Sequence, residues 1–179
     1  GKGLNEKWIQ SMRKHNVPQW YIDSCLKIKY MFPKAHAVAY VMMAVRVAWF
    51  KVYYPRAYYA VYFTLRSNAY EVETMSQGLE AVQKRLNAIN ANLKDYTKMK
   101  EVSLKDKNLV DTFEVTLELI NRGFSVSNID LMKSHADKWI LDPDNDNALL
   151  PPFTAVDGLG LGVANGIVNA RKEREFISK

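Results

Sequence analysis

Two cationic side chains stand where a long apolar helix is expected to begin. The spacing of the apolar residues predicts one helix over residues 35–52, with Pro33 just ahead of its first turn, where the missing N–H of proline costs nothing. Lys34 and His36 would then lie at the positive end of the helix macrodipole, which favours anions. The N–H groups of the first turn, an ammonium and an imidazole together suit a phosphate chain.

One face of this predicted helix combines polar ends with an apolar middle. At helical spacing the face is formed by His36, Tyr40, Met43, Val47 and Lys51. It would present His36 and Tyr40 to a nucleotide while the other faces pack. An alternative stays open, in which Tyr40 is a core residue and His36 a capped surface residue.

Aromatic side chains dominate the next predicted helix, residues 57–66. They are Tyr58, Tyr59, Tyr62 and Phe63, and they lie between Arg56 and Arg66. Aromatic rings can stack on bases while guanidinium groups hold phosphates. An aromatic helix is nonetheless more often part of a core, so no tyrosine is assigned individually.

A second pattern suited to phosphate is FTAVDGLGLGVANGIVNAR, residues 153–171. Its candidate DNA-binding residues are Gly158, Gly160, Gly162, Val163, Arg171 and Lys172. The glycines permit a tight turn whose N–H groups point outward, with a helix N-terminus behind them. The pattern resembles a helix-hairpin-helix motif, which grips a DNA backbone without reading bases. It fits neither a dinucleotide fingerprint nor a Walker loop; a plain glycine-rich turn is the alternative.

Positive charge is concentrated in the first third of the chain. Residues 1–66 carry eleven Lys and Arg against two Asp and Glu, a net charge of +9. Residues 67–150 have a net charge of −4 and residues 151–179 a net charge of +1. This distribution predicts a polyanionic partner near the long apolar helix.

The remaining periodicity predicts a mostly α fold with a small α+β region. Helices are expected over residues 1–16, 20–29, 75–89 and 104–122, with Gly123 ending the last one and a polar connection over 87–100. Short strands are expected at 128–131, 138–141 and 148–150. The second and third would pair as a β-hairpin across residues 142–147.

The turn of that hairpin contains three carboxylates with the spacing of calcium ligands. Asp142, Asp144 and Asp146 match the first three positions of a calcium loop. Asn147 stands where such a loop needs glycine, and Phe153 stands where it needs a bidentate glutamate. We therefore predict a plain turn and no metal site.

Cys25 is the only cysteine, which excludes an intrachain disulfide and fits a reducing compartment. The longest uncharged apolar run, residues 37–45, is too short to span a bilayer. The expected location is the cytoplasm, without membrane contact. The chain has neither an initiator methionine nor a clear end to its last helix, so we expect an excised fragment.

The stretch MFPKAHAVAY and its surroundings resemble the fingers region of family C replicative DNA polymerases, in particular the PolC type of low-GC Gram-positive bacteria. The resemblance continues through NRGFSVSNIDL, LLPPFTAVDGLG and the hairpin, and so covers essentially the whole chain. It implies a C-terminal fragment of a multidomain polymerase. Residues 1–127 would be the fingers helical region. Residues 128–179 would bind duplex DNA through a truncated helix-hairpin-helix at 153–179.

The resemblance also implies substrates, partners and roles. The whole enzyme would extend a primer–template DNA with deoxynucleoside triphosphates, using Mg²⁺ held by aspartates upstream of Gly1. Lys34, His36 and Tyr40 occupy positions of the family's fingers motif and would hold the triphosphate and the sugar or base, with Arg46 or Lys51 in support. This chain would contain no catalytic residue or metal ligand and would be inactive alone. A sliding clamp and other replisome proteins would bind elsewhere, and the charge of Arg56 is unexplained.

Two other functions remain open from the sequence. One is a stand-alone, non-sequence-specific DNA-binding module built on the hairpin. The other is an interaction scaffold whose apolar helices dock a partner. Binding of a nucleoside triphosphate near Lys34 would distinguish the polymerase function from the stand-alone DNA-binding module.

Overall fold

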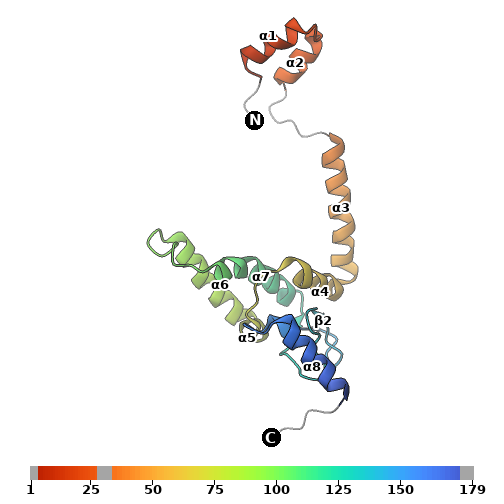
Figure 1. Cartoon of the computed structure of the whole chain (residues 1–179), viewed down its shortest axis with the longest axis vertical. Coiled ribbons are helices and arrows are strands. Elements are labelled where there is room, and N and C mark those ends of the chain that lie inside the picture. The colour runs from red at the N-terminus through yellow and green to blue at the C-terminus, as the bar shows by residue number, and fades with distance from the viewer. Residues whose placement is uncertain (1–3, 28–33, 174–179) are drawn as a thin grey trace. The chain divides into compact units, whose positions relative to one another are not determined.

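The computed structural model describes residues 4–27 and 34–173, and these residues are mainly helical, as predicted (Figure 1). They divide into two compact units, Gly1–Val47 and Ala48–Lys179. The first unit contains α1 (Glu6–Lys14), α2 (Gln19–Lys27) and most of α3 (Lys34–Tyr53). Pro33, the end of the predicted helix 20–29 and residues 174–179 of the predicted helix-hairpin-helix lie outside the described residues.

A capping hydrogen bond explains where α1 begins. Asn5 accepts a hydrogen bond from the backbone N–H of Trp8 at 3.0 Å, which satisfies one of the unpaired donors of the first turn. Asn16 takes a positive φ of 55° between the two helices, a conformation that asparagine tolerates. Ile9 and Ile22 are buried. The helix predicted within residues 1–16 is therefore confirmed as α1, and its buried residue is Ile9.

The second unit is built around α4 (Pro55–Arg66), α5 (Val72–Ser76), α6 (Leu79–Lys94) and α7 (Leu104–Asn121). Tyr54 alone separates α3 from α4, and Pro55 takes the first helical position, where proline is well tolerated. The core joins these helices through Tyr59, Phe63, Val82, Leu86 and Phe113. Burial of these apolar side chains is the main force that holds the helices together.

Two predictions for residues 75–100 were wrong at their boundaries. Gly78 has φ of 93° and interrupts the expected helix, so that α5 ends before it and α6 begins after it. Only glycine adopts this backbone conformation at low cost. The polar residues 87–94, expected in a connection, instead continue α6 to Lys94, and the connection to α7 is residues 95–103. The polar side chains of this segment lie on the exposed face of α6, while Ile89 is buried.

The end of α7 agrees closely with prediction. Gly123 has φ of 87° and donates to the carbonyl of Ile120 at 2.9 Å, while Phe124 donates to Leu119 at 3.2 Å. This pair of bonds is the Schellman motif, which satisfies carbonyls at a helix C-terminus. It turns the chain sharply into the small sheet.

The sheet has three strands in the order β1-β3-β2. They are β1 (Ser125–Val126), β2 (Ile140–Leu141) and β3 (Ala148–Leu150). The antiparallel pairing of β2 with β3 confirms the predicted hairpin, whereas the parallel pairing of β1 with β3 was not predicted. The strand expected at 128–131 is absent from the described structure; Asp130 there accepts bonds from the N–H groups of Met132 and Lys133, which makes a turn.

The main buried cluster includes side chains from the small sheet and from the segment that leads into it. Trp139 and Leu149 belong to the same buried cluster as the side chains of α4 and α7, and the Trp139 ring lies 4.9 Å from that of Phe63. Thr64 strengthens this junction, because its hydroxyl accepts the Trp139 backbone N–H at 3.0 Å. The small sheet thus shares its core with the preceding helices.

A second buried cluster supports the last helix, α8 (Leu161–Glu173). Ala136, Phe153 and Ala164 form its centre. Phe153 also begins a short 3₁₀ turn, η1 (Phe153–Ala155), which is fixed by a hydrogen bond from the Phe153 N–H to the carbonyl of His135 at 2.9 Å. The glycine-rich turn therefore rests on packed residues.

Candidate functional site

The first turns of α3 bring the predicted nucleotide-binding side chains together. Lys34 is the first residue of the helix, and the rings of His36 and Tyr40 lie with their centroids 4.3 Å apart. Tyr40 is 66% exposed, so it is not a core residue of the described structure. No acidic side chain occupies the first turn. A cation, an imidazole and an aromatic ring thus share one end of an exposed helix.

Arg46 and Lys51 lie farther along the same helix. At about 1.5 Å of rise per residue, Lys51 is about 25 Å along the helix axis from Lys34, so one triphosphate cannot contact both. The Lys51 ammonium instead binds Glu118 of α7 at 2.8 Å and lies 5.4 Å from the centroid of the Tyr58 ring. Arg46 is exposed on the apolar helix.

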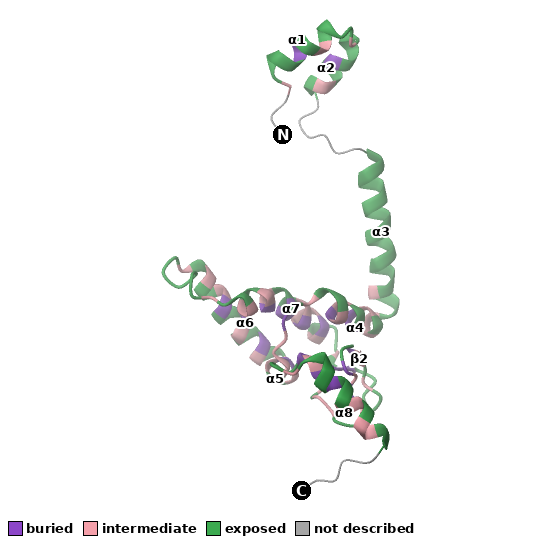
Figure 2. Cartoon of the chain, in the orientation of Figure 1, coloured by how far each residue is buried: buried purple, intermediate pink, exposed green. Residues whose placement is uncertain are grey.

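Burial separates α3 from the other described helices. Every residue of α3 is exposed except Lys51, which is half-buried (Figure 2). Within the described ranges, α3 alone is long and apolar enough to cross a membrane by length and composition, with a mean hydropathy of 1.3. Arg46 lies inside that stretch, and arginine near the centre of a membrane helix costs about 2.5–3.5 kcal/mol on insertion scales.

The aromatic side chains of α4 are mostly structural. Tyr59 and Phe63 are fully buried, and Tyr58 and Tyr62 pack against the same core. Burial, reinforced by the nearby Glu118 carboxylate, raises the pKa of Tyr59. These positions leave little ring surface for stacking on bases.

Arg56, whose charge had no explanation in the sequence, forms an ion pair with Asp146 at 3.4 Å. The other carboxylates of the hairpin turn face different partners: Asp144 pairs with Lys133, and Asp142 accepts a hydrogen bond from Ser127. That hydrogen bond is the main reason that the pKa of Asp142 is lowered. Within the described residues no group of three His, Cys, Asp or Glu side chains is placed to hold a metal ion.

The glycine-rich turn leads directly into α8. Gly158 has φ of 78°, and the N–H of Leu159 closes the turn on the carbonyl of Val156 at 3.1 Å. A Cβ added to Gly158, Gly160 or Gly162 would meet nothing within 4 Å. Val163 is 61% exposed. The surface around the turn is therefore open, and the element before it is the turn η1 rather than an α-helix.

The two cations at the end of α8 differ in their surroundings. Arg171 donates to the backbone carbonyls of Ser134 at 2.7 Å and Leu131 at 3.2 Å. Its guanidinium thus joins α8 to the loop after β1. Lys172 is exposed. Of the pair, Lys172 is the more exposed to solvent, because Arg171 is half-buried.

Sequence reasoning missed a cation beside the turn. Lys105, in the first turn of α7, forms an ion pair with Asp157, which directly precedes Gly158. The two residues are 52 positions apart in the chain, so no local pattern could have indicated the pair. It places one carboxylate and one ammonium next to the exposed glycines.

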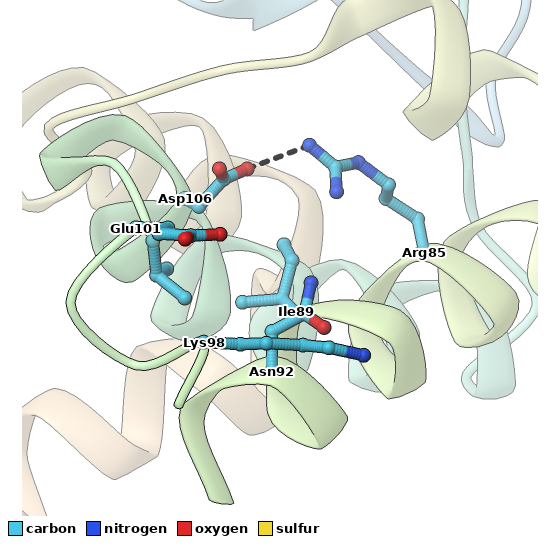
Figure 3. A pocket seen from close by; sticks show the side chains of 7 residues that line it. Arg85, Ile89, Asn92, Lys98, Glu101 and Asp106 are labelled. Carbon is cyan, nitrogen blue, oxygen red and sulfur yellow. Dashed lines mark hydrogen bonds and ion pairs between the residues drawn. The ribbon is translucent and has the colours of Figure 1, made fainter. Parts of the chain in front are cut away.

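A pocket of about 200 Å³ lies between α6, α7 and the loop that joins them (Figure 3). Arg85 points across it and binds Asp106 at 2.6 Å, and the same guanidinium binds Glu71 at 3.2 Å. Lys98 and Glu101 complete a lining with both signs of charge. Two cations and two carboxylates therefore line the pocket, and their formal charges cancel.

Comparisons with known proteins give a consistent result. No family model matches the chain. It is 52% identical to the DNA polymerase III PolC-type of Oceanobacillus iheyensis, 50% identical to that of Halalkalibacterium halodurans and 49% identical to that of Bacillus subtilis, each over 179 residues. These matches cover 100% of the chain and 12% of each relative. The chain thus matches PolC-type proteins along its whole length and spans about 12% of theirs.

Proposed function

We propose that this chain is the part of a PolC-type replicative DNA polymerase that receives the incoming deoxynucleoside triphosphate and supports the duplex product. The similarity along the entire chain carries this proposal. The exposed cluster of Lys34, His36 and Tyr40 and the open glycine-rich turn are the surfaces that would perform these two tasks.

The nucleotide would bind at the N-terminal end of α3. The unpaired N–H groups of the first turn and the helix macrodipole attract its phosphates. Lys34 adds a full positive charge, and His36 can donate a hydrogen bond. The adjacent Tyr40 ring offers a flat surface for the sugar or base. Lys51 supports this site through its ion pair with Glu118.

The bond-forming chemistry would belong to other parts of the polymerase. The primer 3′ hydroxyl attacks the α-phosphorus of the triphosphate, a new phosphodiester bond forms, and pyrophosphate leaves. This reaction uses two Mg²⁺ ions held by clustered carboxylates. The described residues contain no such cluster, and residues 1–66 have only Glu6 and Asp23. The Mg²⁺ ligands would lie outside this chain, which would be inactive alone.

Duplex DNA would contact the turn and the start of α8. Gly158, Gly160 and Gly162 let a phosphate approach the backbone N–H groups, and Val163 lies on the same exposed stretch. Lys172 adds charge, whereas Arg171 holds α8 in place through Ser134. Such contacts bind the DNA backbone without regard to sequence. Other replisome proteins, including a sliding clamp, would bind outside this chain, in the cytoplasm.

The nucleotide site can be tested in the full-length polymerase with Lys34→Glu combined with His36→Glu. Loss of two charge-assisted contacts should raise the KM for nucleotide about tenfold or more. Lys14→Glu, an exposed change in α1, is the matched control and should leave KM unchanged. An unaltered KM in the double variant would refute the site.

One observation favours a narrower function. The turn and α8 belong to the compact unit Ala48–Lys179, which does not include Lys34 or His36. A stand-alone module that binds duplex DNA would need only that unit. Nucleoside triphosphate titration followed by NMR separates the two functions, since only the polymerase reading predicts shifts around Lys34.

A further inference from the structure

Glu118 in α7 holds two cations at once. Its Oε2 accepts a hydrogen bond from the Lys51 ammonium at 2.8 Å, and its Oε1 lies 3.3 Å from Nε of Arg122. Lys51 comes from the last two turns of α3, whereas Arg122 caps α7 itself. One carboxylate therefore connects the ends of two helices.

Arg122 closes this arrangement into a ring. Its Nη1 donates to the backbone carbonyl of Lys51 at 3.1 Å. The last carbonyls of a helix lack partners within the helix, and a cation there also opposes the negative end of the macrodipole. Glu118 thus holds the side chain of Lys51 directly and the backbone of Lys51 through Arg122.

Exposure distinguishes this end of α3 from the rest of the described helix. Lys51 is the one residue of the helix that is not exposed. The helix then ends at Tyr53, one residue before α4. Its C-terminal end is consequently fixed by Glu118, Arg122 and the aromatic residue Tyr58, over whose ring the Lys51 ammonium lies.

We propose that Glu118 is a positioning residue for nucleotide binding: it anchors the C-terminal end of the helix whose N-terminal end carries Lys34 and His36. This inference rests on the proposed function of α3. Because α3 is continuous from Lys34 to Tyr53, loosening one end changes how steadily the other end is presented. The same proposal gives Lys51 a different role: it supports the nucleotide site by binding Glu118 and does not contact a phosphate itself.

The test uses the full-length polymerase with Glu118→Gln, which keeps the size of the side chain but removes its charge. The KM for nucleotide should rise about five- to tenfold, because misplaced contacts weaken binding, while kcat changes less than about twofold. Glu114→Gln is the matched control, since Glu114 is exposed one turn earlier on α7. The Kd for primer–template DNA should stay unchanged, which a general loss of folding would not allow.

Lys51→Met provides the second arm. If Lys51 acts through Glu118, the double variant should have the same KM as the worse single variant, because contacting residues of one network are not additive. If the increases in KM of the two single variants instead multiply in the double variant, Lys51 contacts the nucleotide independently of Glu118, and the role proposed for Lys51 is wrong. If Lys34→Glu raises KM but Glu118→Gln does not, the positioning role fails while the proposed function stands. If neither changes KM, both fail.

Discussion

Arg171 in α8 donates a 2.7 Å hydrogen bond to the backbone carbonyl of Ser134. The sequence predicted a DNA phosphate as the partner of this guanidinium. Its second bond, to the carbonyl of Leu131, comes from the same Nη1 atom, so the donors of this nitrogen hold α8 against the loop after β1. The neighbouring Lys172 is exposed and has the character expected of a phosphate contact.

This difference predicts opposite phenotypes for two adjacent substitutions. Arg171→Ala should lower the free energy of unfolding by about 1.5–3 kcal/mol, the usual contribution of hydrogen bonds to a charged group. Lys172→Ala should leave stability unchanged, weaken duplex binding and reduce the slope of log affinity against log salt by about one. Urea denaturation and binding titrations at several salt concentrations measure both. Equal effects of the two changes on stability would contradict the assignment.

The ion pair between Lys105 and Asp157 predicts that DNA binding can be strengthened. Asp157→Asn removes a negative charge beside the proposed phosphate contact and frees the Lys105 ammonium to meet DNA. Duplex affinity should rise about two- to fivefold at low salt, and the gain should disappear at high salt because exposed charges are screened. Lys105→Ala should do the reverse. Asp111→Asn, which changes an exposed aspartate of α7, serves as the control. Weaker binding by Asp157→Asn would contradict the prediction.

Substitution by alanine should lower the stability of the fold at Gly123 but not at Gly160. Gly123→Ala forces an alanine to φ of 87°, and should destabilise the fold by about 1 kcal/mol or more. Gly160 has open space around it and no positive φ, so Gly160→Ala should leave stability unchanged. Gly160→Val should weaken duplex binding, since its branched side chain would block a phosphate. Thermal denaturation and DNA titration distinguish these outcomes, and a stability loss in Gly160→Ala would disprove the account of the turn.

The general architecture was predictable because local signals and tertiary packing agree. The periodicity of α7, its end at Gly123, the hairpin of β2 and β3 and the exposed residues Lys34 and His36 at the start of α3 all follow from nearby sequence. The parallel partner β1 could not be predicted, because its two residues become a strand only when β3 pairs beside them. Gly78 was missed for a different reason: the apolar period continues across it.

In the candidate sites, too, local features could be predicted from the sequence and long-range contacts could not. Residue types and spacing indicated which side chains suit phosphate, but not which of them the fold already uses. Glu118 lies 67 positions from Lys51 and could not be linked to it by spacing. In the structure the Lys51 and Arg171 side chains both bind partners within the chain, Glu118 for Lys51 and the carbonyls of Ser134 and Leu131 for Arg171.

Glu118 should also make the free energy of unfolding depend on pH. Partial burial opposes its ionisation, but the hydrogen bond and charge of Lys51 outweigh burial and lower the pKa of Glu118 below its usual 4.5. Its contribution is thus fully present above that value and is lost as pH falls through the lowered pKa. Glu118→Gln should be less stable than wild type at pH 7, and the difference should vanish under more acidic conditions. Denaturation curves from pH 7 to about pH 3 test this; a constant difference would contradict it.

The central place of β3 has a consequence for biosynthesis. β3 contacts both β1 and β2, and its Leu149 completes a core that begins with Tyr59 in α4. A ribosome delivers the chain from its N-terminus, so the apolar faces of α4, α6 and α7 emerge well before Leu149 is available to cover them. During that interval the nascent chain exposes an unfinished core and an unpaired strand. Translation pauses placed before residue 148 should therefore increase its capture by chaperones.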